Sequence, residues 1–188
     1  AAGAVQPGDE DDYFQSSLFT IARRRILWLL ILVLANGLTT KVIAMNDQIL
    51  KEIVLLAAFI PLLIGTGGNV GAQSSTVVIR GLSTQKLKSL GAIRAVVKEA
   101  ITGALLGVFM MLVVFPFAWW QGEGPLIASA VGISLISITT LAATTGAILP
   151  LLFDRMKLDP ALMSSPFITT VTDIAGVFIY LSTAKWLL

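Results

Sequence analysis

Residues 126–153 read LIASAVGISLISITTLAATTGAILPLLF, a stretch without a charged side chain that decides the class of fold. A helix of about 20 residues, at 1.5 Å of rise per residue, crosses the roughly 30 Å hydrocarbon core of a bilayer. The stretch exceeds that length, and it is too long and too continuously apolar for a strand of a transmembrane barrel. It therefore predicts a membrane-spanning α-helix.

Four further apolar segments have a similar length, and they cover residues 26–44, 53–79, 96–117 and 161–188. Only helices and closed barrels satisfy their backbone hydrogen bonds in lipid. We therefore expect an all-α membrane protein, a bundle of five transmembrane helices per chain. Residues 1–22 are interpreted as a polar, acidic cytoplasmic tail and residues 23–188 as the five-helix transmembrane domain.

The composition supports lipid as the main solvent of this chain. Hydrophobic residues make up 56% of the 188 residues, the mean hydropathy is +0.88, and charged residues make up 13%, against about 25% in soluble domains. Cysteine and histidine are absent, which excludes disulfides and the usual ligands of zinc, copper and iron–sulfur clusters. We expect no enzyme activity, and a lipid bilayer rather than nucleic acid as the partner of the surface.

The basic residues are divided unequally between the two ends of the predicted helices. Ten lie at one end and three at the other, and the positive-inside rule places the richer end in the cytoplasm. We therefore expect a multi-pass protein of the inner cell membrane with a cytoplasmic N-terminus and an extracytoplasmic C-terminus. The ten are Arg23, Arg24, Arg25, Arg80, Lys86, Lys88, Arg94, Lys98, Arg155 and Lys157; the three are Lys41, Lys51 and Lys185.

Asp173 stands near the middle of the fifth apolar segment, without a basic residue close by in the sequence. A lone carboxylate at that depth costs a few kcal/mol unless it faces water, a partner or a cation. At about 100° per residue, polar and small residues share one arc of this helix with it, which predicts an aqueous path. A protonated Asp173 bonded to a neighbouring helix is the alternative. The arc contains Ser165, Thr169, Thr172, Asp173, Gly176, Tyr180 and Thr183.

The second segment contains the unusual run PLLIGTGGNVGAQ, residues 61–73. Proline and clustered glycines weaken a helix, so we expect irregular backbone with freed carbonyls lining a cavity. Gly65, Asn69, Gln73 and Thr76 recur on one helical face. Glycines in membrane helices also allow close packing, which is the alternative here and the interpretation that we adopt for Gly103 and Gly107.

Carboxylate, carbonyl, hydroxyl and amide groups are hard oxygen donors, which suit Mg²⁺, Ca²⁺ or Mn²⁺. Mg²⁺ keeps most of its water and is commonly held through one or two carboxylates. One Asp173 per chain provides one negative charge for a divalent ion. This favours a homodimer with the path on its two-fold axis.

The run at residues 61–73, the following residues 74–80, and Asp159-Pro160-Ala161 leading to Thr172-Asp173 and Gly176 resemble the transmembrane domain of the MgtE magnesium channel family. The resemblance covers residues 13–188. It implies a homodimeric channel for hydrated Mg²⁺, with Mn²⁺ or Ca²⁺ as possible ions, whose second and fifth helices line a central pore.

The resemblance also implies roles for individual residues. Asp173 corresponds to the ion-binding carboxylate of the pore. The other implied metal-site residues are Asn69, Gly65, Thr172, Thr169 and Gly176. Leu162 and Ser165 correspond to the cytoplasmic constriction, with Ser165 where better-known members tend to have asparagine.

The family also carries regulatory cytoplasmic domains and a plug helix before the pore. The resemblance leads us to expect that this chain lacks them, apart from a remnant of a linker or plug helix in residues 1–22. The 23–188 segment is then the pore domain.

Three other functions compete with a channel. A proton- or sodium-coupled secondary transporter of divalent cations would use Asp173 as its coupling site, although no internal repeat is visible. An intramembrane aspartyl protease would need two carboxylates, and one chain offers only Asp173 at depth. A structural anchor would leave the polar face of the fifth helix without a purpose.

Overall fold

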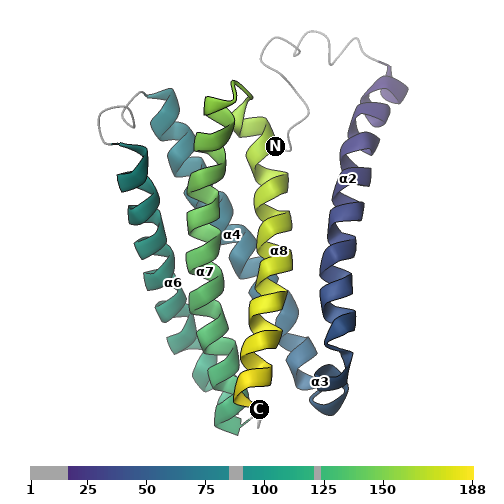
Figure 1. Cartoon of the computed structure of the whole chain (residues 1–188), viewed down its shortest axis with the longest axis vertical. Helices are drawn as coiled ribbons and strands as arrows, with labels where there is room; N and C mark the ends of the chain where they lie inside the picture. Colours follow the sequence, from purple (N-terminus) through teal and green to yellow (C-terminus); the bar gives the residue numbers. More distant parts are fainter. Residues whose placement is uncertain (1–16, 85–90, 121–123) are drawn as a thin grey trace.

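The computed structural model describes residues 17–84, 91–120 and 124–188, and every element in these ranges is an α-helix. This confirms the predicted all-α class. The end of α4, the start of α6 and the α7–α8 turn lie at one end of the bundle, while α3 and the C-terminus lie at the other (Figure 1). The helices are α2 (Leu18–Met45), α3 (Asp47–Glu52), α4 (Leu55–Ser83), α6 (Ala92–Trp120), α7 (Gly124–Arg155) and α8 (Pro160–Leu187).

Within the described ranges, four helices are long and apolar enough to cross a membrane, namely α4, α6, α7 and the part of α8 from Ser164 to Leu187. Their bounds agree with the predicted segments to within a few residues. The agreement has a simple cause, because a backbone in lipid must keep its own hydrogen bonds and so remains helical for the whole length of an apolar segment.

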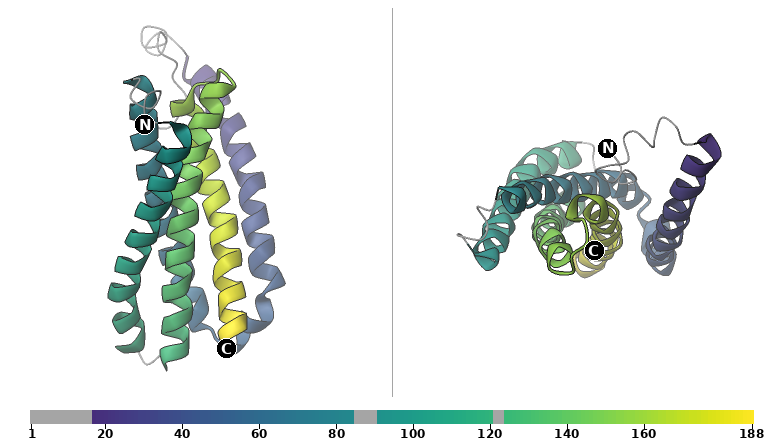
Figure 2. Two further views of the ribbon diagram at one scale, coloured as in Figure 1. Left: turned by 60° about the vertical axis from the view of Figure 1, so that its left-hand side comes forward. Right: turned by 90° about the horizontal axis from the view of Figure 1, so that it is seen from above.

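The first predicted span, residues 26–44, lies within helix α2. The apolar part described there is the shorter range Leu29–Met45, and Arg23, Arg24 and Arg25 precede it in the same helix. Among the described residues, the structure therefore has four long apolar helices and one shorter apolar helix. Helix α2 stands apart from the bundle and reaches it mainly through α8 (Figure 2). Thr39 is its one buried side chain in the described part.

Helix α7 is the centre of the bundle and packs against α4, α6 and α8. Its contact with α6 depends on two glycines. A Cβ atom built on Gly103 would lie 2.5 Å from the carbonyl oxygen of Thr139, and one built on Gly107 would overlap Thr139 and Ile136. The two backbones therefore approach too closely for any side chain, which confirms the packing interpretation of Gly103 and Gly107.

The contact between α7 and α4 also depends on glycines that let the two backbones approach closely. A Cβ atom on Gly146 would overlap the carbonyl oxygen of Gly71. One turn further along α4, the buried hydroxyl of Ser74 donates a hydrogen bond to the carbonyl oxygen of Ala143, at 2.7 Å. This bond joins two helices directly, whereas most hydroxyls of the described helices bond to a carbonyl of their own helix.

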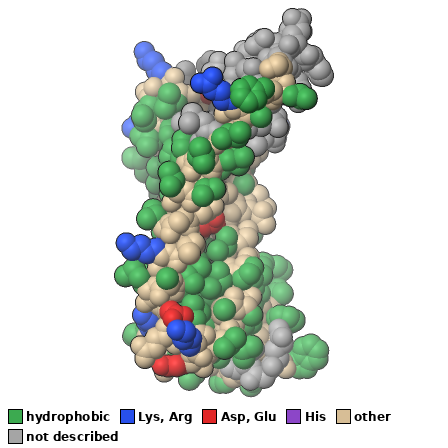
Figure 3. All heavy atoms as spheres, turned by 90° about the vertical axis from the view of Figure 1, so that its right-hand side faces the viewer, with side chains coloured by type: hydrophobic (Ala, Val, Ile, Leu, Met, Phe, Trp, Pro, Cys, Tyr) green, Lys and Arg blue, Asp and Glu red, His purple; other side chains and the backbone are tan. Residues whose placement is uncertain are grey.

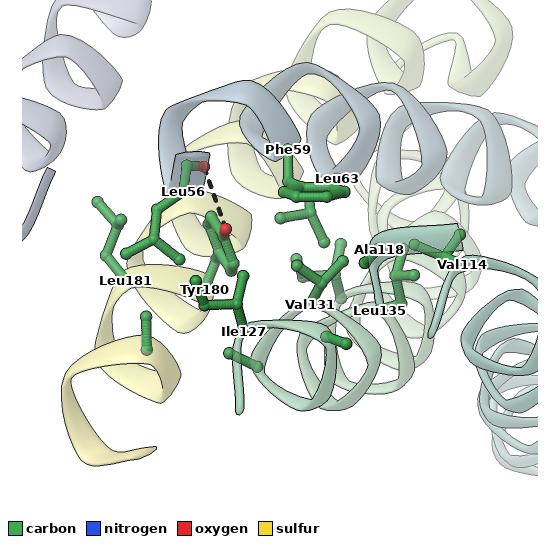
Figure 4. Close-up of a cluster of buried hydrophobic side chains, with 14 of the residues drawn as sticks. Leu56, Phe59, Leu63, Val114, Ala118, Ile127, Val131, Leu135, Tyr180 and Leu181 are labelled. Carbon is green, nitrogen blue, oxygen red and sulfur yellow. Dashed lines mark hydrogen bonds between the residues drawn. The ribbon is translucent and has the colours of Figure 1, made fainter. Parts of the chain in front are cut away.

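The larger hydrophobic side chains gather at the end of the bundle that includes the C-terminus (Figure 4). Leu56, Phe59 and Leu63 of α4 lie there against side chains from α6, α7 and α8. The Tyr180 hydroxyl donates to the carbonyl oxygen of Leu56, at 3.1 Å, so the polar tip of this fully buried ring is satisfied.

The turn between α7 and α8 satisfies the backbone groups that both helix ends leave free. Lys157 has a positive φ of 57°, and the amide groups of Lys157 and Leu158 donate to the carbonyls of Asp154 and Phe153. This is a Schellman motif with lysine at the position that usually holds glycine. Asp159 then caps α8 by accepting from the amide of Ala161, at 2.8 Å, and Pro160 occupies the first helical position.

We predict that Gly103→Ala lowers the free energy of unfolding by about 1–3 kcal/mol, because the added methyl group must push α6 away from α7. The measurement is unfolding of the purified protein in mixed detergent micelles. Gly37→Ala on α2 is the matched control, since a Cβ atom there meets nothing within 4 Å; it should be neutral or stabilising by up to about 1 kcal/mol. Equal effects of the two substitutions would contradict the packing assignment.

Ser74→Ala should lower the free energy of unfolding by about 0.5–1.5 kcal/mol, because it removes one hydrogen bond between helices in a dry contact. The same unfolding assay provides the measurement. The control is Ser137→Ala, where the lost hydroxyl bonds only to Ile133 of its own helix, and we expect a change within about 0.5 kcal/mol. The assignment fails if Ser74→Ala is as mild as the control.

Candidate cation site

Helix α4 runs without interruption through Pro61 and the glycine-rich run. The expectation of irregular backbone in residues 61–73 is therefore wrong. The glycines serve packing instead: Cβ atoms on Gly67 and Gly71 would lie 2.8 Å from the Cγ2 of Ile138 and 2.5 Å from the Cγ2 of Ile168. Loss of side-chain bulk lets α4 lie in the groove between α7 and α8, and the tight contact supports the helix that the glycines alone would weaken.

Because these glycines face inward, the opposite side of α4 faces outward. Gly65, Asn69, Gln73 and Thr76 are all exposed in the single chain, and we call them the α4 stripe. A Cβ atom on Gly65 would meet nothing within 4 Å. The Thr76 hydroxyl donates to the carbonyl of Ala72 at 2.8 Å. The exposed side-chain amides of Asn69 and Gln73 are available to a molecule that covers this face.

The predicted polar arc of α8 is divided in two by packing. Thr172 is buried, with its hydroxyl donating to the carbonyls of Ile168 and Thr169 at 2.8 and 3.0 Å. Gly176 and Tyr180 are buried as well, and Gly176 lies beside Ile138. Leu181, which lies outside the predicted arc, is also fully buried. Helix α8 packs against α4, α7 and α2, so its inward surface includes residues from within and from outside that arc.

The outer part of the arc contains Ser165 and Thr169, which are exposed, and Asp173, which is half-buried. In the described ranges, no side chain or backbone group makes a hydrogen bond or ion pair with the Asp173 carboxylate. Thr169 bonds to carbonyls of its own helix, those of Ser165 at 3.3 Å and Pro166 at 3.0 Å.

The contacts between α4 and α8 set the relative height of these residues. A Cβ atom on Gly67 would lie 3.7 Å from the Cβ of Thr172, and one on Gly68 would lie 4.0 Å from the Cγ2 of Thr169. The two helices run in opposite directions, so this register places Asn69 level with Thr169, and Gly65 level with Asp173. These four residues lie in the middle of their helices. On the face drawn in Figure 3, acidic atoms are visible at mid-height, next to tan atoms of the backbone and of other side chains and to hydrophobic side chains.

The two residues assigned to the cytoplasmic constriction are described to different extents. Ser165 is exposed on the first turns of α8, and its carbonyl is one of the two acceptors of the Thr169 hydroxyl. The backbone of Leu162 lies in the first turn after Pro160, while its side chain falls outside the described part of the structure.

Sequence reasoning did not identify two residues that hold the site without lining it, namely Ser74, and Tyr180, which it placed on the polar arc. Ser74 anchors α4 to α7, and Tyr180 anchors α8 to the start of α4. Their acceptors are backbone carbonyls 69 and 124 residues away in the sequence, and a carbonyl has no sequence signature. The one available signal was the position of Ser74 three residues after Gly71, on the packing face.

Comparison with known proteins agrees with the resemblance. The pattern of a family described as MgtE, divalent cation transporter, matches residues 60–183. A protein named magnesium transporter MgtE from Thermus thermophilus is 40% identical over 164 residues, which are 87% of this chain and 36% of that protein. The same-named protein of Bacillus subtilis is 34% identical over 176 residues, 93% of this chain and 39% of its own length.

The chain thus spans well under half the length of these relatives. The match covers the helices that carry the α4 stripe and Asp173, and the family consists of transporters, which confirms the prediction that the chain is not an enzyme. From its sequence and its helical membrane architecture, this chain belongs to the MgtE family of divalent cation transporters.

Proposed function

We propose that this domain passes hydrated Mg²⁺ across the cell membrane through a path lined by α4 and α8 on the axis of a homodimer. The observation that carries the proposal is the band of polar groups formed by the α4 stripe, which begins at mid-height, together with Thr169 and the half-buried carboxylate of Asp173. The surfaces of α2 and α6 are, by contrast, mostly exposed hydrophobic side chains.

Such a band is unfavourable in contact with lipid. A charged group at the centre of a bilayer costs at least a few kcal/mol, and amides without a partner add to that cost. A second copy of the chain, related by a two-fold axis, would cover the band with an identical band and enclose water between the two. The two Asp173 carboxylates would then match the charge of one divalent ion.

The donor set supports Mg²⁺ in its hydrated form. The carboxylate of Asp173, the amide oxygen of Asn69 and the hydroxyl of Thr169 are hard oxygen groups that hydrogen-bond well to the water shell of the ion. Gly65 leaves space at the level of Asp173. Mn²⁺ and Ca²⁺ share this ligand preference, and the choice of Mg²⁺ is supported by the names of the relatives.

The proposal assigns different roles to the remaining residues of the α8 arc. Thr172 and Gly176 shape the contact of α8 with α4 and α7 from inside, so they position Asp173 rather than contact the ion. Ser165 and Leu162 form the narrow mouth at the cytoplasmic end, two turns or more before Asp173. A serine there extends less far than the asparagine of the better-known members, so the mouth is wider.

Asp173→Asn should reduce Mg²⁺ flux roughly tenfold or more, because the substitution keeps the shape of the side chain and removes the charge that a divalent ion needs. Uptake into liposomes loaded with a magnesium-sensitive dye provides the measurement. Asp159→Asn is the matched control: it makes the same chemical change at the α8 cap, where asparagine also caps, and its flux should equal that of the original chain.

Flux through Asp173→Asn equal to that of the control would refute the ion-binding role of Asp173. A flux of the unmodified chain that stops without a proton or sodium gradient would favour the coupled transporter, with Asp173 as its coupling site, over the channel.

The second prediction of this proposal is a dimer. Light scattering in detergent should give a protein mass of about twice the 20.0 kDa of one chain, because the polar band of each copy is stable only when covered. A monomer that conducts Mg²⁺ after reconstitution at less than one chain per liposome would contradict it.

A further inference from the structure

The face of α4 that carries the α4 stripe continues beyond Thr76. Arg80 follows four residues later, in the last turn of α4, and is also exposed. At about 100° per residue, Gly65, Asn69, Gln73, Thr76 and Arg80 fall within an arc of about 80° on the helix. The face that carries the polar band at mid-height therefore carries a permanent positive charge at its end.

Arg80 lies at the end of the bundle that contains the start of α6 and the α7–α8 turn, which we call the Arg-rich end (Figure 1). In the described part of the chain, no carboxylate forms an ion pair with its guanidinium group. Asp159, an acidic residue of the same end, uses its carboxylate to cap α8. The other cations of this end, such as Arg94 and Arg155, belong to α6 and α7 and are outside the stripe.

We propose that Arg80 is an electrostatic determinant of cation flow: its charge lowers the local cation concentration where the path opens at the Arg-rich end. The inference rests on the proposed function, since it places Arg80 on the face that lines the path. In a two-fold dimer the two Arg80 side chains act together. Entry of cations from this end is reduced more than entry from the opposite end, so the path favours flow toward the Arg-rich end.

The charge of the ion sets a quantitative expectation. The local concentration of an ion follows a Boltzmann factor in its valence, so an effect of about threefold on a monovalent cation corresponds to about ninefold on a divalent one. The effect also depends on salt, because the Debye length is about 30 Å at 0.01 M and about 8 Å at 0.15 M ionic strength. An arginine that only anchors the helix to lipid phosphates has neither property.

The first test records Mg²⁺ current in planar bilayers with Mg²⁺ added at the Arg-rich end. Arg80→Gln should raise this current roughly three- to tenfold at about 0.01 M ionic strength, with a much smaller rise at 0.15 M. Arg80→Lys, which keeps the charge, should stay close to the original chain. Arg94→Gln is the control for charge removal at the same end but on α6, and it should raise the current by a clearly smaller factor than Arg80→Gln.

The chain contains no cysteine, so the Arg80→Cys variant has a single thiol per chain. The second test modifies this thiol. Methanethiosulfonate reagents that add a positive group should return the current to the low level of the original chain. Reagents that add a negative group should raise it above the level of Arg80→Gln. Both readings come from one folded protein before and after modification, so they are independent of any effect of the substitution on folding.

The outcomes separate the two proposals. Equal currents for Arg80→Gln and Arg94→Gln at low ionic strength, or equal responses to the two reagents, would overturn the role of Arg80 while leaving the path intact. Undiminished Mg²⁺ flux through Asp173→Asn would overturn the path itself. A loss of protein stability in Arg80→Gln without a change in current per channel would identify Arg80 as a lipid-phosphate anchor and refute the inference.

Discussion

The backbone of α7 touches the backbones of α4 and α6 at glycines, and the rest of the bundle depends on this close approach. Gly146 meets Gly71 on one side, and Gly103 meets Thr139 on the other. In lipid, burial of apolar surface provides little force between helices, so association relies on dense packing and on hydrogen bonds between helices. The glycine contacts provide the dense packing, and the Ser74 hydroxyl provides a hydrogen bond between helices.

This constraint determines which face of α4 is available for function. The residues that allow the close approach, Gly67, Gly71 and Ser74, occupy one side of the helix, so the α4 stripe must lie on the other. The same contact holds α8 against α4 with Thr172 inside and Asp173 at the edge. A polar band that is unfavourable in lipid is thus a direct consequence of the packing that stabilises the chain.

The sequence predicted the long helices well and their surfaces less well. Uncharged apolar segments determined the bounds of α4, α6, α7 and α8 because a backbone in lipid has no alternative to the helix. The helical wheel of α8 failed because it assumes one inward and one outward side, whereas α8 has neighbours on two sides. The glycine-rich run was expected to disrupt α4, since helix propensity was weighed without the contacts that these glycines make.

By itself, the sequence determined the all-helical class, the division of basic residues between the two ends, and the depth of Asp173, since these depend on composition and on distance along one helix. The tertiary structure alone decided which side of each helix is covered. It turned Thr172, Gly176 and Tyr180 inward and left Asn69, Thr169 and Arg80 outside. The reason is that packing between α4, α7 and α8 depends on contacts between residues distant in the sequence, such as Gly71 with Ile168 and Gly146, for which a one-dimensional pattern contains no direct signal.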